Sequence, residues 1–89
     1  MGILEQEPNK HIGTAIGEKY LLWKKEFGDN HNAYDKEFGK LIINIFYDKE
    51  EGLFNWNVDD SQRNYHKHGL SNSYHDARFE AIDSWYNQY

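Results

Sequence analysis

Histidine and aspartate side chains gather between residues 66 and 76, where they could bind a metal ion. His66 and His68 are two positions apart, so on a strand both imidazoles would point to one face, and His75 and Asp76 follow. Three ligands without a supporting motif often occur by chance in a chain with five histidines. We therefore interpret these residues as exposed histidines and expect neither a bound metal nor another cofactor.

The remaining polar residues show no pattern typical of catalysis. The chain has no cysteine, which excludes a thiol nucleophile, a thiolate metal site and a disulfide framework. Its carboxylates are not accompanied by a nucleophile elbow or an HExxH motif. A domain of 89 residues also has little room to enclose a substrate pocket. We expect that the protein is not an enzyme.

Carboxylates around a predicted hairpin could bind a basic partner. Asp48, Glu50 and Glu51 crowd the hairpin loop, and Asp59 and Asp60 end the second strand. Negative charge is therefore expected at the strand ends near this loop, where it would attract a basic surface. The competing interpretation is that these charges only keep the hairpin ends soluble.

The chain also has more aromatic rings than a core of this size needs. Phe, Tyr and Trp make up 17% of the residues, so part of the tyrosines should be exposed. Exposed tyrosines are typical of interfaces, because they provide a large contact area at a small loss of conformational entropy. The tyrosines concerned are Tyr34, Tyr47, Tyr65, Tyr86 and Tyr89. Tyr47 and Tyr65, with the five acidic residues, form the predicted partner-binding set.

Net charge separates the candidate functions. Ten Lys and Arg against fifteen Asp and Glu leave a charge of −5, which disfavours binding to nucleic acid through its phosphates. The favoured function is a non-enzymatic protein that binds and inhibits a larger basic protein. The alternative is a module that binds a nucleotide or nucleic acid by ring stacking. A positive strip on a sheet face would favour this alternative, formed by Lys36, Lys40, Arg63 and Lys67.

The sequence indicates no membrane partner. No apolar run approaches 18 residues, and the first eight residues carry acids where a secretory leader would carry bases. We therefore expect a cytoplasmic protein. Exposed rings leave a homodimer open as a further partner.

The elements that must position these residues begin with a predicted N-terminal helix. Five apolar residues recur at spacings of three and four, as on the buried face of a helix: Ile12, Ile16, Tyr20, Trp23 and Phe27. Two glycines leave an extended conformation of residues 11–17 as the alternative. Residues 28–30 should end this helix, and residues 31–39 are rich in turn formers, with Tyr34 and Phe38 spaced for one short helical turn. Residues 1–9 are expected to be a flexible lead-in to a single domain at residues 10–89.

The middle of the chain predicts an antiparallel hairpin. Residues 41–47 and 53–58 are β-branched, aromatic or strictly alternating, and residues 48–52 join them. In the second strand Phe54, Trp56 and Val58 should face the core, and the intervening residues should face solvent. A weaker third strand is expected at residues 63–68.

The C-terminal helix has the clearest start signal in the chain. Ser73 can cap it, and Asp76 stands three residues later. Ala77, Ala81 and Trp85 repeat at intervals of four and form an apolar stripe that should pack on the hairpin.

These elements predict an α+β fold: an N-terminal helix, an antiparallel sheet of two or three strands, and a C-terminal helix packed on one sheet face. The expected core residues are Ile16, Tyr20, Trp23, Ile43, Ile45, Trp56, Ala81 and Trp85.

The segment Gly69–Ala81, after the hairpin, resembles the last part of the double-stranded-RNA-binding domain. In that family the final helix opens with a Ser, two lysines and a later Ala-Lys pair, and Ser73, Ala77 and Arg78 match this pattern. Tyr74 and His75 stand where the family has phosphate-contacting lysines. The resemblance, over roughly residues 40–88, implies the layout and not RNA affinity.

The whole chain also resembles the short, acidic, asparagine- and tyrosine-rich proteins of phages and prophages, which include anti-CRISPR and other anti-defence inhibitors. Many of these have a small sheet covered by a helix. The resemblance implies a stoichiometric binder in the host cytoplasm that covers a site, mimics nucleic acid or sequesters a signalling nucleotide.

Overall fold

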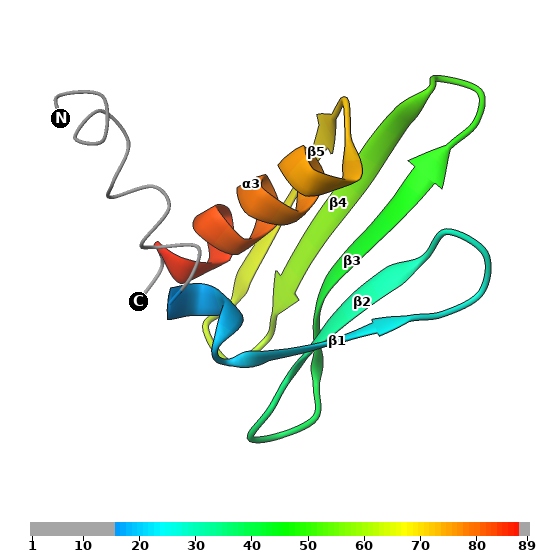
Figure 1. Cartoon of the computed structure of the whole chain (residues 1–89). Coiled ribbons are helices and arrows are strands. Elements are labelled where there is room, and N and C mark those ends of the chain that lie inside the picture. Colours follow the sequence, from blue (N-terminus) through cyan, green and yellow to red (C-terminus); the bar gives the residue numbers. More distant parts are fainter. Residues whose placement is uncertain (1–15, 88–89) are drawn as a thin grey trace, which may run out of the picture.

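A five-stranded antiparallel sheet is the largest element of the protein in the computed structural model, which describes residues 16–87. The strands are β1 (Leu21–Lys25), β2 (His31–Asp35), β3 (Leu41–Asp48), β4 (Leu53–Asp60) and β5 (Tyr65–Ser71), and each pairs with the next. Helix α3 (Tyr74–Tyr86) lies across one face of the sheet (Figure 1). Three expectations fall outside the described residues: the lead-in at residues 1–9, the conformation of residues 11–15 and the exposure of Tyr89.

The α+β class is confirmed, but the predicted N-terminal helix is wrong from residue 19 onward. Within the described residues only 16–18 of this helix are helical, and residues 21–25 form β1. Burial alternates along β1, since Leu21 is buried, Leu22 is exposed and Trp23 is half-buried. Short apolar runs fit a helix and a strand equally well, and pairing with β2 decides between them here.

Strand β2 also replaces a predicted turn, so the sheet has five strands rather than two or three. Ala33 is fully buried between Trp23 on β1 and Ile43 on β3, its partners in the sheet register. Asn32 is buried as well, and its amide is satisfied by bonds to Asn44 and Glu26. Neighbouring strands supply these contacts, so local composition gave no sign of them.

The secondary structure predicted for the second half of the chain is confirmed, although the third strand lies at residues 65–71 rather than 63–68. Strands β3 and β4 form the hairpin, and β5 is the weaker third strand of the prediction. Ser73 caps α3, because its Oγ accepts the Asp76 N–H at 3.1 Å. Phe54, Trp56 and Val58 face α3, as the alternation predicted.

The core lies between α3 and the sheet. The buried apolar residues are Leu21, Ala33, Ile42, Ile43, Ile45, Trp56, Val58, Ala77, Ala81, Ile82 and Trp85. Of the predicted core residues, Trp23 and Ile16 are half-buried, and Tyr20 is 50% exposed because the helix that was to bury it does not form. Gly69 on β5 lies against the Trp56 indole. A Cβ atom there would approach the ring to 2.5 Å, so only glycine fits.

A buried polar contact fixes α3 to the far end of β4. Trp85 is 1% exposed, and its Nε1 donates to Asp60 Oδ2 at 2.9 Å. The other oxygen, Asp60 Oδ1, accepts the Gln62 N–H at 3.1 Å. Asp60 is itself 3% exposed and lies 3.5 Å from Arg63 Nε. Both carboxylate oxygens therefore hold the fold together.

This contact predicts different effects for two adjacent aspartates. Asp60→Asn leaves only one oxygen for two donors, so the free energy of unfolding should fall by about 1–3 kcal/mol. Asp59→Asn removes the same charge from a side chain that is 67% exposed and pairs with His66. Its effect should stay within about 0.5 kcal/mol. Urea unfolding of both variants measures the difference, and equal effects would contradict a structural role for Asp60.

Candidate functional site

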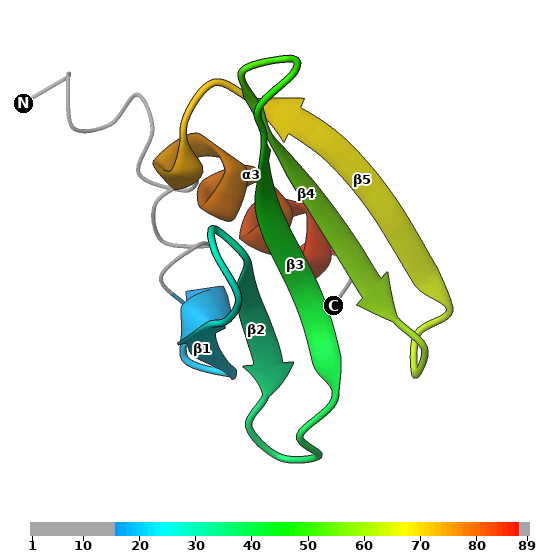
Figure 2. The same cartoon turned by 90° about the vertical axis from the view of Figure 1, so that its right-hand side faces the viewer.

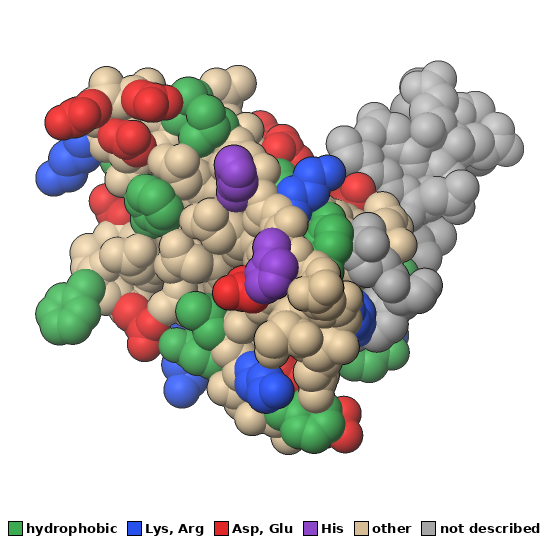
Figure 3. All heavy atoms as spheres, turned by 180° about the vertical axis from the view of Figure 1, so that it is seen from behind, with side chains coloured by type: hydrophobic (Ala, Val, Ile, Leu, Met, Phe, Trp, Pro, Cys, Tyr) green, Lys and Arg blue, Asp and Glu red, His purple; other side chains and the backbone are tan. Residues whose placement is uncertain are grey.

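The sheet face opposite α3 is open in the described part of the chain (Figure 3). A row of paired residues crosses it from β1 to β5: Lys24, Asn32, Asn44, Asn57 and His68. Several of its polar groups already form hydrogen bonds within the chain. Asn44 Nδ2 donates to Asn32 Oδ1 at 2.6 Å, and the Asn32 amide donates to the Glu26 carboxylate. Near β1 and β2, the row therefore binds mainly to itself.

Tyr34 joins the same network beside β1. Its hydroxyl donates to Glu26 Oε2 at 3.2 Å, and the Lys24 ammonium lies 5.4 Å from its ring centre. Loss of hydration, together with the bond to Glu26, raises the pKa of Tyr34 above its ordinary value. Tyr34 therefore acts as a neutral donor that helps to hold Glu26 in place.

The structure separates the histidines that were considered as metal ligands. His66 and His68 both point to the open face, and His66 Nδ1 lies 2.8 Å from Asp59 Oδ1. His75 and Asp76 lie in the first turn of α3, on the other side of the sheet. Within residues 16–87, no three His, Cys, Asp or Glu side chains form a group that could hold a metal ion.

The acidic residues predicted to bind a partner lie at opposite ends of β4. Asp48, Glu50 and Glu51 are at the β3–β4 turn, where β4 begins. Asp59 and Asp60 are at the other end of that strand, roughly 23 Å away at 3.3 Å per residue. The structure therefore does not bring these five residues together.

Two of the five have bonds that build turns. Asp48 Oδ1 accepts the N–H groups of Glu50 and Glu51 at 2.9 and 3.4 Å. Asp60 makes the corresponding bond to Gln62 after β4. An aspartate at a strand end that bonds the backbone two residues later is a common turn device. Glu50 and Glu51 remain exposed at the hairpin tip.

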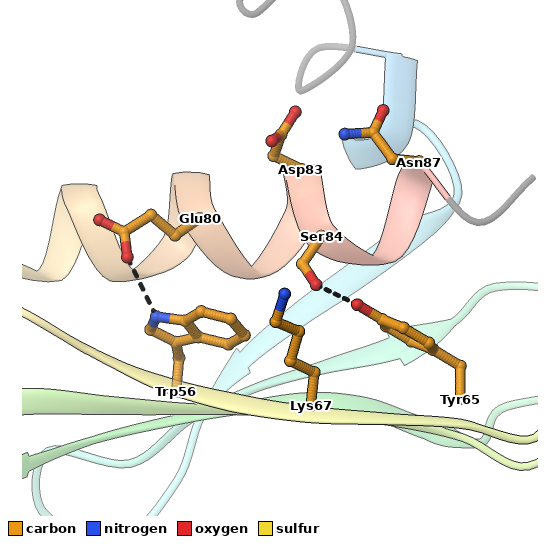
Figure 4. A pocket seen from close by; sticks show the side chains of 7 residues that line it. All are labelled: Trp56, Tyr65, Lys67, Glu80, Asp83, Ser84 and Asn87. Carbon is orange, nitrogen blue, oxygen red and sulfur yellow. Dashed lines mark hydrogen bonds between the residues drawn. The ribbon is translucent and has the colours of Figure 1, made fainter.

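The two predicted tyrosines also lie apart. Tyr47 is 37% exposed next to the hairpin tip, and its ring centre lies 4.9 Å from that of Phe54. Tyr65 is half-buried, and its hydroxyl bonds the Ser84 hydroxyl of α3 (Figure 4). Only Tyr47 is thus placed beside Glu50 and Glu51.

Tyr65 lines an open groove of about 340 Å³ between β5 and α3, with Trp56, Lys67, Glu80, Asp83, Ser84 and Asn87. Glu80 Oε1 accepts bonds from Trp56 Nε1 at 3.3 Å and from Ser71 Oγ at 2.8 Å. Lys67 rises from β5 toward α3 between the two rings (Figure 4). Within the described chain, Lys67 forms no ion pair.

The basic strip that would favour a nucleotide is not formed on a sheet face. Lys36 and Lys40 lie in the β2–β3 turn. Arg63 lies in the β4–β5 turn beside Asp60, and its guanidinium is 5.1 Å from the Trp85 ring centre. Lys67 points to the groove on the α3 side.

The two ends of the sheet nevertheless differ in net charge. Because the strands follow one another in a meander, the β1–β2 and β3–β4 turns share one end, and the other two turns share the opposite end. We call residues 26–30 and 48–52 the acidic end, since they carry five carboxylates and one lysine. At the opposite end, residues 35–40 and 60–64 carry three cations and three carboxylates. In Figure 3 carboxylates gather around the hairpin tip.

Phe27, at the acidic end, is a second residue of the predicted helix that the structure exposes, after Tyr20. It was expected on the buried stripe of a helix, and it is 93% exposed in the β1–β2 turn. Backbone bonds from Glu26 N to Asn30 O at 2.8 Å and from Asn30 N to Phe27 O at 3.2 Å close this turn. Gly28 has a φ of 61°, which glycine adopts without strain. The Phe-Gly-Asp-Asn sequence was the available signal for such a turn.

No protein-family model matches the chain, and comparisons with curated proteins and with solved structures find no match either. Among residues 16–87, no helix has the length and apolarity needed to cross a membrane.

The imidazole of His31, beside the acidic end, has a lowered pKa. Its ring centre lies 4.2 Å from that of Tyr74 at the start of α3. Loss of hydration lowers the pKa of His31 below 6.5, Lys25 and Arg78 lower it further, and Asp29 opposes them. The fold therefore favours the neutral imidazole.

Acidification should accordingly weaken the fold through His31. Below pH 6.5 the unfolded chain binds a proton at this residue more readily than the folded chain, so stability falls as the pH falls. In His31→Asn this contribution disappears, and the loss of melting temperature between about pH 7.5 and 5.5 should be smaller than in the parent chain. The other histidines and all carboxylates are common to both proteins. Equal losses in thermal melts would contradict the assignment.

Proposed function

We propose that this protein is a non-enzymatic binding protein that engages a larger, basic partner through its acidic end. The observation that carries the proposal is Phe27, a large apolar side chain that is 93% exposed within a hydrogen-bonded turn. Such a turn loses little conformational entropy on binding, so an aromatic side chain on it is suited to anchor a partner.

Charge around Phe27 supports a basic partner. Asp29 shares its turn, and Glu50 and Glu51 are exposed on the neighbouring hairpin tip. Tyr47 adds a partly exposed ring next to that tip. An apolar anchor with carboxylates around it matches a basic surface that has an apolar pocket.

Inhibition is the expected consequence of this binding. Proteins that bind nucleic acid use basic surfaces, and an acidic protein that covers such a surface blocks it. The resemblance to short, acidic anti-defence proteins of phages motivates this part of the proposal. Lys36, Lys40, Arg63 and Lys67 do not form a strip on a sheet face, which favours a protein partner over a nucleotide.

Substitution of Phe27 should weaken binding without weakening the fold. We expect the full chain, immobilised, to retain a basic protein from an extract of its source organism. Phe27→Ser should lower the affinity for that protein by at least about tenfold, as expected for loss of an interface anchor. Phe38→Ser is the matched control, because Phe38 is 56% exposed in a turn at the opposite end. Thermal melts should show both variants folded.

The salt dependence of binding to the same partner gives a second test. Raising the salt from about 0.1 M to 1 M shortens the Debye length from about 10 Å to 3 Å, so binding should weaken markedly. Glu50→Gln with Glu51→Gln should reduce this salt dependence, and Glu37→Gln in the β2–β3 turn should leave it unchanged. An affinity that responds neither to salt nor to Phe27→Ser would contradict the proposal.

A further inference from the structure

The two edge strands of the sheet differ in how well they resist pairing with another chain. β1 is five residues long and carries Lys24 and Lys25. Short strands and lysines are the usual protection of a sheet edge. β5 is seven residues long, has no acidic residue or proline, and carries Lys67 as its only lysine. No other element of the described chain lies beyond it (Figure 2).

The unpaired edge of β5 therefore presents a row of free backbone donors and acceptors. Leu70 near its end is 50% exposed, which adds apolar surface beside that row. An exposed edge of this length is a template for one further strand.

We propose that two copies of this chain pair through antiparallel β5 strands to form a continuous ten-stranded sheet. A two-fold axis at His68 gives the longest overlap, because all seven residues of each strand then have partners. In this register Lys67 of one copy lies opposite Gly69 of the other, and His66 lies opposite Leu70. The inference is independent of the function proposed for the acidic end.

Charge and shape favour a second copy as the occupant of this edge. On the α3 side the Trp56 indole covers Gly69, so the stem of Lys67 from the other copy lies beside that ring and its ammonium points toward α3. Glu80 lies there, since it accepts bonds from Trp56, the sheet partner of Gly69, and from Ser71. Lys67 is without an ion pair in the described part of its own chain. The two-fold axis therefore creates two Lys67–Glu80 pairs between copies.

A single introduced cysteine tests the register, because the natural chain has none. In His68→Cys the two thiols meet at the axis, where directly opposed Cα atoms are about 4.5–5.5 Å apart and a disulfide can form. Oxidised glutathione should convert this variant to a covalent dimer on a denaturing gel. In His66→Cys the introduced thiol is on the same face, but it lies opposite Leu70 of the other copy, four residues along the strand from the second thiol. This variant should therefore run as a monomer on the denaturing gel.

The strength of the pairing is measured on the full chain by sedimentation equilibrium over a range of concentrations. The parent chain should associate to a dimer, and Lys67→Glu should raise its dissociation constant by at least about tenfold. Lys25→Glu makes the same charge change on β1 and should have no such effect. A parent chain that stays monomeric at all concentrations, pairing lost in Lys25→Glu alone, or equal cross-linking at both cysteine positions would overturn the proposal.

Discussion

One helix must cover a sheet of five strands, and the arrangement of the described chain depends on this constraint. α3 has 13 residues, which is about 20 Å of helix, and it contacts β3, β4 and β5. Ala77 and Ala81 let the helix approach closely, and Trp85 is held by the buried Asp60. One sheet face and both edge strands remain for contact with other molecules.

α3 packs mainly on β3, β4 and β5, so the sheet face near β1 is covered by other groups. Arg78 of α3 lies 4.2 Å from the Trp23 ring centre, and its guanidinium bonds Glu18 in the helical turn before β1 at 2.6 Å. A cation stacked on an aromatic ring and paired with a carboxylate joins three segments of the chain. This is how the first described residues become part of the same core.

The order of the strands determines which charged turns lie at the same end of the sheet. Consecutive strands reverse direction, so alternate turns meet at the same end of the sheet. The exposed Phe27 and the carboxylates of the hairpin tip thereby share one end, although more than 20 residues separate them in the chain. The edge of β5 is a separate surface with a different chemistry, in which backbone groups rather than carboxylates would make the contacts.

The sequence by itself determined the elements whose signals are local. The β3–β4 hairpin follows from β-branched residues on both sides of a turn, and α3 follows from Ser73 and a stripe of Ala77, Ala81 and Trp85. Only the tertiary structure decided that Trp23 and Ala33 belong to strands, because their partners lie on neighbouring strands. It also decided which acidic side chains are exposed. Asp60 and Glu50 look alike in the sequence, but burial against Trp85 assigns one to the fold, and only the other is left to meet a partner.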